Sequence, residues 1–318
     1  MTSRRRRDRE SHPFGTFYLT SRPKAIYHLR SDHGGGGRAI RMRLKMWGVR
    51  GSIPTPGPDT VEFGGNTSCY EVRAGDTLII LDGGTGLRLL GQSLLAEMPI
   101  EAWLFFSHVH WDHIQGFPFF TPAFVRKNII HLFGGHNVSR TLEETLAGQM
   151  DYPSFPVHLS EMGAQMTFRD LYEGEVISIG KKQDVRVSNA RGNHPNGVYA
   201  YRVDHEGKSI VYVTDSEHYA IVDPKLRRLA QGADVLIFDA MYTPEEYAGQ
   251  VGGGPKTGWG HATYVAGCEL AAAANVKQLV LHHHDPSQTD AMVRDKERRA
   301  RELFPNTLAA REGLVIDL

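Results

Sequence analysis

The stretch Ser107-His108-Val109-His110-Trp111-Asp112-His113 follows directly on an apolar run at residues 103–106. The run predicts a β-strand, and side chains two apart on a strand share a face, so His108 and His110 are expected to point the same way. Asp112 and His113 follow on the turn into the next helix. Four ligand-type side chains within six residues can surround two cations, and imidazole with carboxylate suits zinc, manganese or iron. We expect zinc, because this set contains no cysteine.

Further ligand-type residues follow predicted strands later in the chain. His194 lies in the turn-forming segment Gly192-Asn193-His194-Pro195-Asn196, after a strand predicted at residues 185–190. Asp215 follows the strand predicted at 209–214, where a carboxylate could bridge two ions. His282, His283 and His284 follow the strand predicted at 278–281. Because adjacent side chains on a strand point to opposite sides, only one or two of these three are expected to be ligands.

The composition is that of a soluble enzyme. The chain has 318 residues, of which 41% are hydrophobic and 23% charged. No apolar run reaches the roughly 18 residues that a membrane-spanning helix needs, so we expect no membrane segment. The two cysteines, Cys69 and Cys268, are far apart in the sequence, which excludes a disulfide scaffold or a thiolate zinc knuckle. A reducing cytoplasm is the expected location.

Strand-like and helix-like segments alternate from residue 43 onward. The pattern predicts an α/β protein: two halves, each a sheet with helices on its outer face, which together form a four-layer αββα sandwich. The site is expected where strand-end loops of both halves meet. Strands are predicted at 44–49, 68–73, 77–81, 102–106, 129–133, 185–190, 198–203, 209–214, 235–238 and 278–281, and helices at 87–98, 139–150, 224–230, 263–274 and 290–303.

Charge divides the chain unevenly. Residues 1–45 hold twelve Lys or Arg against three acidic residues, a net charge of +9, while residues 46–318 hold 24 against 33, a net charge of −9. Residues 1–42 are expected to form a flexible basic extension, and residues 43–318 a single folded domain. The extension could bind nucleic acid, but a solvated tail, or an extension upstream of a start near Met42 or Met46, is favoured.

These motifs resemble the metallo-β-lactamase fold superfamily, and specifically its phosphodiesterase branch, which includes ribonuclease Z and bacterial cyclic phosphodiesterases. Leu81-Asp82-Gly83-Gly84-Thr85-Gly86 is similar to the family's first motif, and residues 108–113 to its metal motif. Gly260-His261-Ala262-Thr263 resembles the branch's histidine-small-threonine motif. The resemblance covers roughly residues 43–318.

The resemblance implies a site with two divalent ions that share a bridging carboxylate and a hydroxide. It implies that Asp82 orients a ligand imidazole, and that His261 protonates the leaving oxygen. His261 and Asp112 are therefore the predicted catalytic residues. His282 is the alternative to His283 as the last metal ligand. The predicted ligands are His108, His110, Asp112, His113, His194, Asp215 and His283.

The substrate is expected to be a small or cyclic nucleotide-type phosphodiester. Trp111 and Tyr152 could stack on a base, or be packing residues, and Asn66 could contact substrate or stabilise a turn. Processing of transfer-RNA 3′ ends is the first alternative, disfavoured by the acidic body and by the lack of a basic Gly/Pro-rich insertion before His194. An ester, thioester or lactone hydrolase and a non-catalytic ligand sensor are further alternatives. A homodimer is possible.

Overall fold

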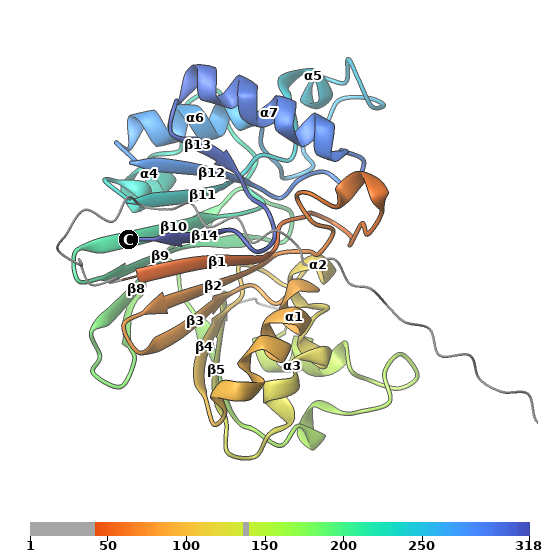
Figure 1. Ribbon diagram of the computed structural model, residues 1–318, viewed down its shortest axis with the longest axis vertical. Coiled ribbons are helices and arrows are strands. Elements are labelled where there is room, and N and C mark those ends of the chain that lie inside the picture. The colour runs from red at the N-terminus through yellow and green to blue at the C-terminus, as the bar shows by residue number, and fades with distance from the viewer. Residues whose placement is uncertain (1–41, 136–139) are drawn as a thin grey trace, which may run out of the picture.

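The computed structural model describes residues 42–135 and 140–318. Two seven-stranded sheets face each other in the middle of the molecule, and helices cover their outer faces (Figure 1). In the first sheet the strand order is β14-β1-β2-β3-β4-β5-β6, and in the second it is β13-β12-β11-β10-β9-β8-β7. Helices α1 and α3 lie on the outside of the first sheet, and α4, α6 and α7 on the outside of the second (Figure 1).

The elements have the following bounds. The strands are β1 Met42–Gly48, β2 Cys69–Ala74, β3 Thr77–Leu81, β4 Glu101–Phe105, β5 Ile129–Gly135, β6 Gln165–Leu171, β7 Val176–Ile179, β8 Val185–Gly192, β9 Val198–His205, β10 Lys208–Val213, β11 Val235–Asp239, β12 Gln278–His282, β13 Thr307–Ala309 and β14 Val315–Asp317. The α-helices are α1 Gly86–Ser93, α2 Trp111–Ile114, α3 Leu142–Gly148, α4 Pro224–Ala230, α5 Pro244–Tyr247, α6 Tyr264–Ala273 and α7 Asp290–Leu303. Short 3₁₀ segments lie at Pro58–Thr60, Leu94–Glu97, Phe117–Phe119, Thr121–Phe124 and Leu159–Glu161.

Three apolar layers hold the sandwich together. The inner faces of both sheets form one buried cluster that includes Leu81, Phe105, Tyr201 and Ile237. A second cluster joins the outer face of the second sheet to α4 and α6. A third cluster joins the outer face of the first sheet to α1 and α3. Strand β11 is buried along its whole length, and its sequence is a nearly continuous apolar run. Such runs are expected when both faces of a sheet are covered.

The predicted αββα sandwich is confirmed, and each of the ten predicted strands is present with ends that differ by at most two residues. Four strands were not predicted: β6, β7, β13 and β14. Strand β14 shows that the two sheets do not correspond to two consecutive halves of the chain. It lies at the C-terminal end of the sequence but belongs to the first sheet, where it pairs antiparallel with β1, with Ile316 opposite Leu44. The segment predicted as one helix over residues 87–98 is α1 followed by a 3₁₀ turn.

The strand directions bring one edge of each sheet to the same place. Strands β3, β4 and β5 run parallel in the first sheet, and β10, β11 and β12 run parallel in the second. The carboxyl ends of parallel strands meet at one edge of a sheet, which is where open α/β sheets place their sites. The loops that follow β3, β4, β10 and β12 carry Asp82, His108, Asp215 and His283, and Asp239 is the last residue of β11.

Two sequence predictions lie partly outside the described residues: the extension over residues 1–42, except Met42, and the first residue of the helix predicted at 139–150. Within the described parts of the chain, no helix combines the length and the apolar character that crossing a bilayer requires.

Candidate metal centre

Three of the predicted site residues leave their strands in an unusual backbone conformation. Asp82, Asp215 and His283 have φ values of 62°, 48° and 61°, in the left-handed region that residues with a side chain rarely adopt. Such strain persists only where the surrounding structure imposes it, and it concentrates at functional sites. At each of these strand ends the chain turns so that the side chain points toward the junction of the two sheets.

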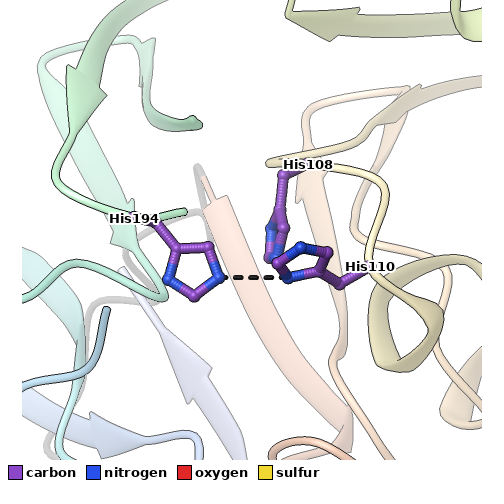
Figure 2. A group of neighbouring side chains, drawn as sticks. All are labelled: His108, His110 and His194. Carbon is purple, nitrogen blue, oxygen red and sulfur yellow. Dashed lines mark hydrogen bonds between the residues drawn. The ribbon is translucent and has the colours of Figure 1, made fainter. Parts of the chain in front are cut away.

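His108, His110 and His194 converge on one point. The Nε2 atom of His108 lies 3.0 Å from Nδ1 of His110, and Nε2 of His194 lies 3.1 Å from that same Nδ1. Figure 2 shows the three rings pointing toward one another, with His194 reaching across from the turn after β8. Burial lowers the pKa of each of these three imidazoles, so the group consists of neutral rings at neutral pH.

The tautomer of His194 is fixed by a backbone carbonyl. Its Nδ1 donates a hydrogen bond to Gly260 O at 2.9 Å, which leaves Nε2 of the neutral ring with a lone pair facing His110. Gly260 has a φ of 86°, and a Cβ there would meet His194 Nδ1 at 2.1 Å, so a glycine is needed for this close approach.

A second group contains Asp112, His113, Asp215 and His283, all of them buried. Nε2 of His283 lies 3.1 Å from Asp112 Oδ2 and 3.1 Å from Asp215 Oδ1. Nε2 of His113 lies 3.2 Å and 3.3 Å from those same two oxygens. Gly51 packs against the His283 ring so closely that a Cβ there would meet it at 2.4 Å.

Asp215 lies between the two groups and turns one oxygen toward each. Its Oδ1 faces His113 and His283 as just described, while its Oδ2 lies 3.7 Å from Nε2 of both His108 and His194. Thr214 donates a hydrogen bond to Oδ1 from the preceding residue. A carboxylate in this position can be shared by two ions.

The charges in the second group support one another. Burial would raise the pKa of both Asp112 and Asp215, but the neighbouring His113 and His283 hold both well below the usual range. Burial likewise opposes protonation of His113, yet Asp112, Asp215 and Asp82 together raise the pKa of its ring well above normal. The carboxylates are therefore ionised, as metal ligands must be.

The donor set fits a pair of divalent cations. His113 Nε2 is fully buried and has no hydrogen-bond partner, although two carboxylates surround it. In the first group, the lone pair of His194 Nε2 faces His110 Nδ1 at 3.1 Å. Two nitrogen lone pairs repel each other at this distance unless they share a proton or a cation. Ligands of a tetrahedral zinc with bonds of about 2.1 Å stand about 3.4 Å apart, which is close to the separations seen here.

Asp82 holds the far side of the His113 ring. Its Oδ2 lies 2.7 Å from His113 Nδ1 and accepts hydrogen bonds from the Tyr212 hydroxyl at 2.7 Å and the Ser107 hydroxyl at 2.8 Å. Such a contact fixes the tautomer and orientation of a ligating imidazole. This is the arrangement in which Asp82 would orient a ligand.

We expect Asp82→Asn to weaken metal affinity about 10- to 100-fold, because the neutral amide holds the His113 ring less well. Asparagine tolerates the left-handed backbone at this position, so the fold should survive. Competition with a chromophoric chelator measures the change. Unaltered affinity would show that Asp82 does not act through His113.

His261 lies beside the second group. Its Nδ1 is 3.1 Å from Asp239 Oδ2 and 3.9 Å from Asp215 Oδ2, and its ring stacks on His283 with centroids 5.0 Å apart. Burial lowers the pKa of His261, but Asp239, together with Asp215 and Asp112, outweighs burial and raises the pKa to about 9. Cations bound nearby would bring this value down, because like charges disfavour the protonated ring. Asp239, Asp215, His261 and His283 also form a third cluster that could hold an ion.

Sequence reasoning missed two carboxylates that organise the site. Asp239 ends β11 and contacts His261, and it also accepts hydrogen bonds from the backbone of Ser216 and Met241. The sequence did contain a signal for Asp239, because this acidic residue is the last residue of a buried apolar strand. Asp82 and Asp215 stand in similar positions, one and two residues after their strands. Glu217 accepts hydrogen bonds from the Gly258 and Gly260 amides and from the Tyr247 hydroxyl, and so holds the turn that leads into His261.

The triple histidine divides into three environments. Nδ1 of His282 lies 2.6 Å from the Tyr70 hydroxyl, between the sheets, and Nε2 of His284 donates to Ala310 O at 2.9 Å. His283 is the one of the three that lies with the carboxylates. The assignment of His283 as the ligand, with His282 as the alternative, stays a prediction that this geometry favours.

The three residues predicted to contact substrate lie in different surroundings. Trp111 and Tyr152 are 80% and 83% exposed, so neither is a packing residue. The Asn66 side chain donates to Glu312 Oε2 at 3.0 Å, and the backbone carbonyl of Asn66 accepts from the Val49 and Arg50 amides, as the turn-stabilising alternative expects. Contact of Asn66, Trp111 or Tyr152 with substrate remains a prediction.

Comparison with known proteins places this geometry in context. The family model described as a beta-lactamase superfamily domain matches residues 77–284. The chain is 26% identical to a ribonuclease Z from Gemmatimonas aurantiaca over 286 residues, which cover 77% of this chain and 88% of the relative.

Solved structures share the fold. The metallo-beta-lactamase fold protein YhfI from Bacillus subtilis superposes with a TM-score of 0.65 at 19% identity, over 87% of this chain and 99% of its own. A diphosphatase from the PhnP family superposes with a TM-score of 0.62 at 17% identity, over 87% of this chain and 98% of its own.

Proposed function

The chain belongs to the beta-lactamase superfamily, and from this membership and the geometry of its site we propose that it is a metal-dependent hydrolase that cleaves small or cyclic nucleotide-type phosphodiesters. The observation that carries the proposal is Asp215, whose two oxygens face two separate groups of ligand-type side chains. The relative named ribonuclease Z supports phosphodiester chemistry.

Each part of the site has a separate role in this proposal. His108, His110 and His194 would hold one ion, Asp112, His113 and His283 the other, and Asp215 would be shared. Two divalent ions, zinc in our proposal, supply activation of water at neutral pH and neutralisation of charge on the phosphoryl oxygens. Asp82 and the Gly260 carbonyl hold His113 and His194 in the orientation that leaves their Nε2 atoms free to bind.

His261 is the proposed acid for the leaving oxygen. Asp239 occupies its Nδ1 atom, which leaves Nε2 to deliver the proton. An alkoxide leaves poorly unless it is protonated, so a positioned acid contributes about 10²- to 10⁴-fold in rate. In this position Asp239 favours the protonated ring, against the opposing effect of the bound cations.

Transfer-RNA 3′ processing is the second candidate, which the relative's name favours. Against it, the body of the chain is acidic, with a net charge of −9 over residues 46–318, whereas RNA backbones are bound mainly by Lys and Arg. In addition, the segment between the metal motif and His194 contains no basic Gly/Pro-rich insertion that could grip RNA.

A panel of substrates distinguishes the candidates. Zinc-loaded protein is expected to hydrolyse bis(p-nitrophenyl) phosphate and a 2′,3′-cyclic nucleotide, with kcat/KM above that for precursor transfer RNA. No rate above background is expected with a lactone. Cleavage of precursor transfer RNA alone would establish the second candidate instead, and hydrolysis of the lactone alone would overturn the phosphodiester assignment.

A further inference from the structure

A pocket of about 300 Å³ opens beside the three-histidine group. His108 and His110 form part of its wall, together with the ends of β4 and β5, the start of α3 and the turn between β8 and β9. Asn196, in that turn, lies with its Nδ2 atom 3.5 Å from His110 Nε2. A ligand bound at the metal centre can therefore extend into this pocket.

The pocket is cationic although the body of the protein is acidic. Arg140 and Arg191 line it, and the described residues that line it include no carboxylate. Guanidinium groups bind phosphate oxygens in pairs of parallel hydrogen bonds and cannot lose their charge at neutral pH. The lining therefore favours an anionic group.

Arg191 is exposed, and its guanidinium group lies next to Gly197 and Tyr199. Its Nη2 atom lies against Gly197, where a Cβ would approach it to 2.8 Å, and its guanidinium carbon is 5.8 Å from the Tyr199 ring centroid. Tyr199 in turn packs on the bare backbone of Gly135, where a Cβ would meet the ring at 2.0 Å. Two glycines thus make room for a tyrosine and an arginine that face the pocket together.

Glu173, the carboxylate whose charge interacts with Arg191, also has another partner. Lys225 donates to Glu173 Oε1 at 2.9 Å and lowers the pKa of that carboxyl, and the Arg191 charge adds to the same shift. Glu173 is exposed and is absent from the described pocket lining. Arg191 therefore keeps hydrogen-bonding capacity for a ligand.

From these observations we infer that the pocket binds a second phosphate of the substrate, one that is not cleaved. The preferred substrate class is then a phosphodiester that also carries a phosphomonoester, such as a nucleotide with a terminal phosphate. The anion site stands on the pocket itself, whereas its role in selecting substrate rests on the proposed function.

Calorimetry on the zinc-loaded full chain tests the anion site without hydrolysis. Thymidine 3′,5′-bisphosphate is expected to bind about 10- to 100-fold more tightly than thymidine 3′-monophosphate. Arg191→Ala should remove this preference, and Arg191→Lys should retain part of it. The matched control is Arg186→Ala, an exposed arginine on the same strand β8 that does not line the pocket.

Kinetics then test the substrate class. The wild-type protein is expected to cleave pTpT, the 5′-phosphorylated dinucleotide, with a lower KM than TpT, and Arg191→Ala should equalise the two. Equal binding of the mono- and bisphosphate by the wild type would overturn the inference, as would equal losses in the Arg191 and Arg186 variants. A bisphosphate preference without cleavage of either dinucleotide, of bis(p-nitrophenyl) phosphate or of a cyclic nucleotide would overturn the proposed function and leave the anion site standing.

Discussion

Asp215→Ala is expected to reduce the metal content from two ions per chain to one or none, and to lower kcat/KM by at least about 10³-fold. The reason is geometric, because one carboxylate faces both groups of ligands, with Oδ1 3.1 Å from His283 Nε2 and Oδ2 3.7 Å from His108 Nε2. Elemental analysis of the purified variant, paired with its rate on bis(p-nitrophenyl) phosphate, measures both effects.

Asp295→Ala is the matched control for this variant. Asp295 lies exposed on α7, where its side chain pairs with Arg298 at 2.8 Å. It belongs to none of the ligand clusters of the site. We expect it to retain both metal content and rate. Two ions and full activity in Asp215→Ala would refute the bridging role.

His261→Ala is expected to lower kcat about 10²- to 10⁴-fold while two ions per chain remain bound. The effect should depend on the leaving group. A cyclic nucleotide releases an alkoxide that needs a proton, so it should show the full loss, whereas p-nitrophenolate leaves without one and should show a much smaller loss. Comparison of the two substrates therefore separates proton donation from general disruption of the site.

The alternative role of His261 has its own signature. His261 also falls in a cluster with Asp215, Asp239 and His283 that could hold an ion, so it could be a ligand. If His261→Ala loses metal, and kcat falls by the same factor for both substrates, His261 is a ligand and its assignment as an acid is contradicted. His158→Ala, a change at an exposed histidine, serves as the control.

The sequence predicted the core of the fold because its central strands are buried on both faces. Such strands are continuous apolar runs that end at Gly, Pro or Asp, and β3 at Thr77–Leu81 was predicted with its observed ends. The missed strands lack this signal. Strand β6 alternates exposed and half-buried residues at the edge of its sheet, and β13 and β14 have only three residues each.

The candidate site could be predicted only where its residues are close in sequence or follow a recognisable strand. Residues 108–113 satisfy both conditions. The choice between His282 and His283 depends on where β12 ends: the strand includes His282, which points between the sheets, and the chain then turns at His283 with a φ of 61°. Alternation along a strand does not predict such a turn.

Residues that act from distant loops left no pattern in the sequence. Glu217 is linked to Gly258 and Gly260 only through the folded chain, and Arg140, Arg191 and Tyr199 meet at a pocket although they come from separate elements. Their proximity follows from the way β5, α3 and the β8–β9 turn converge, which is a property of the tertiary structure.

Titration of metal-free protein with zinc tests the central claim most directly. Hydrolysis of bis(p-nitrophenyl) phosphate is followed while bound zinc is counted in the same sample. We predict no activity without metal, and a rate that reaches its plateau at two bound ions per chain. Full activity in the presence of excess chelator, or an inactive protein with two ions bound, would contradict the account.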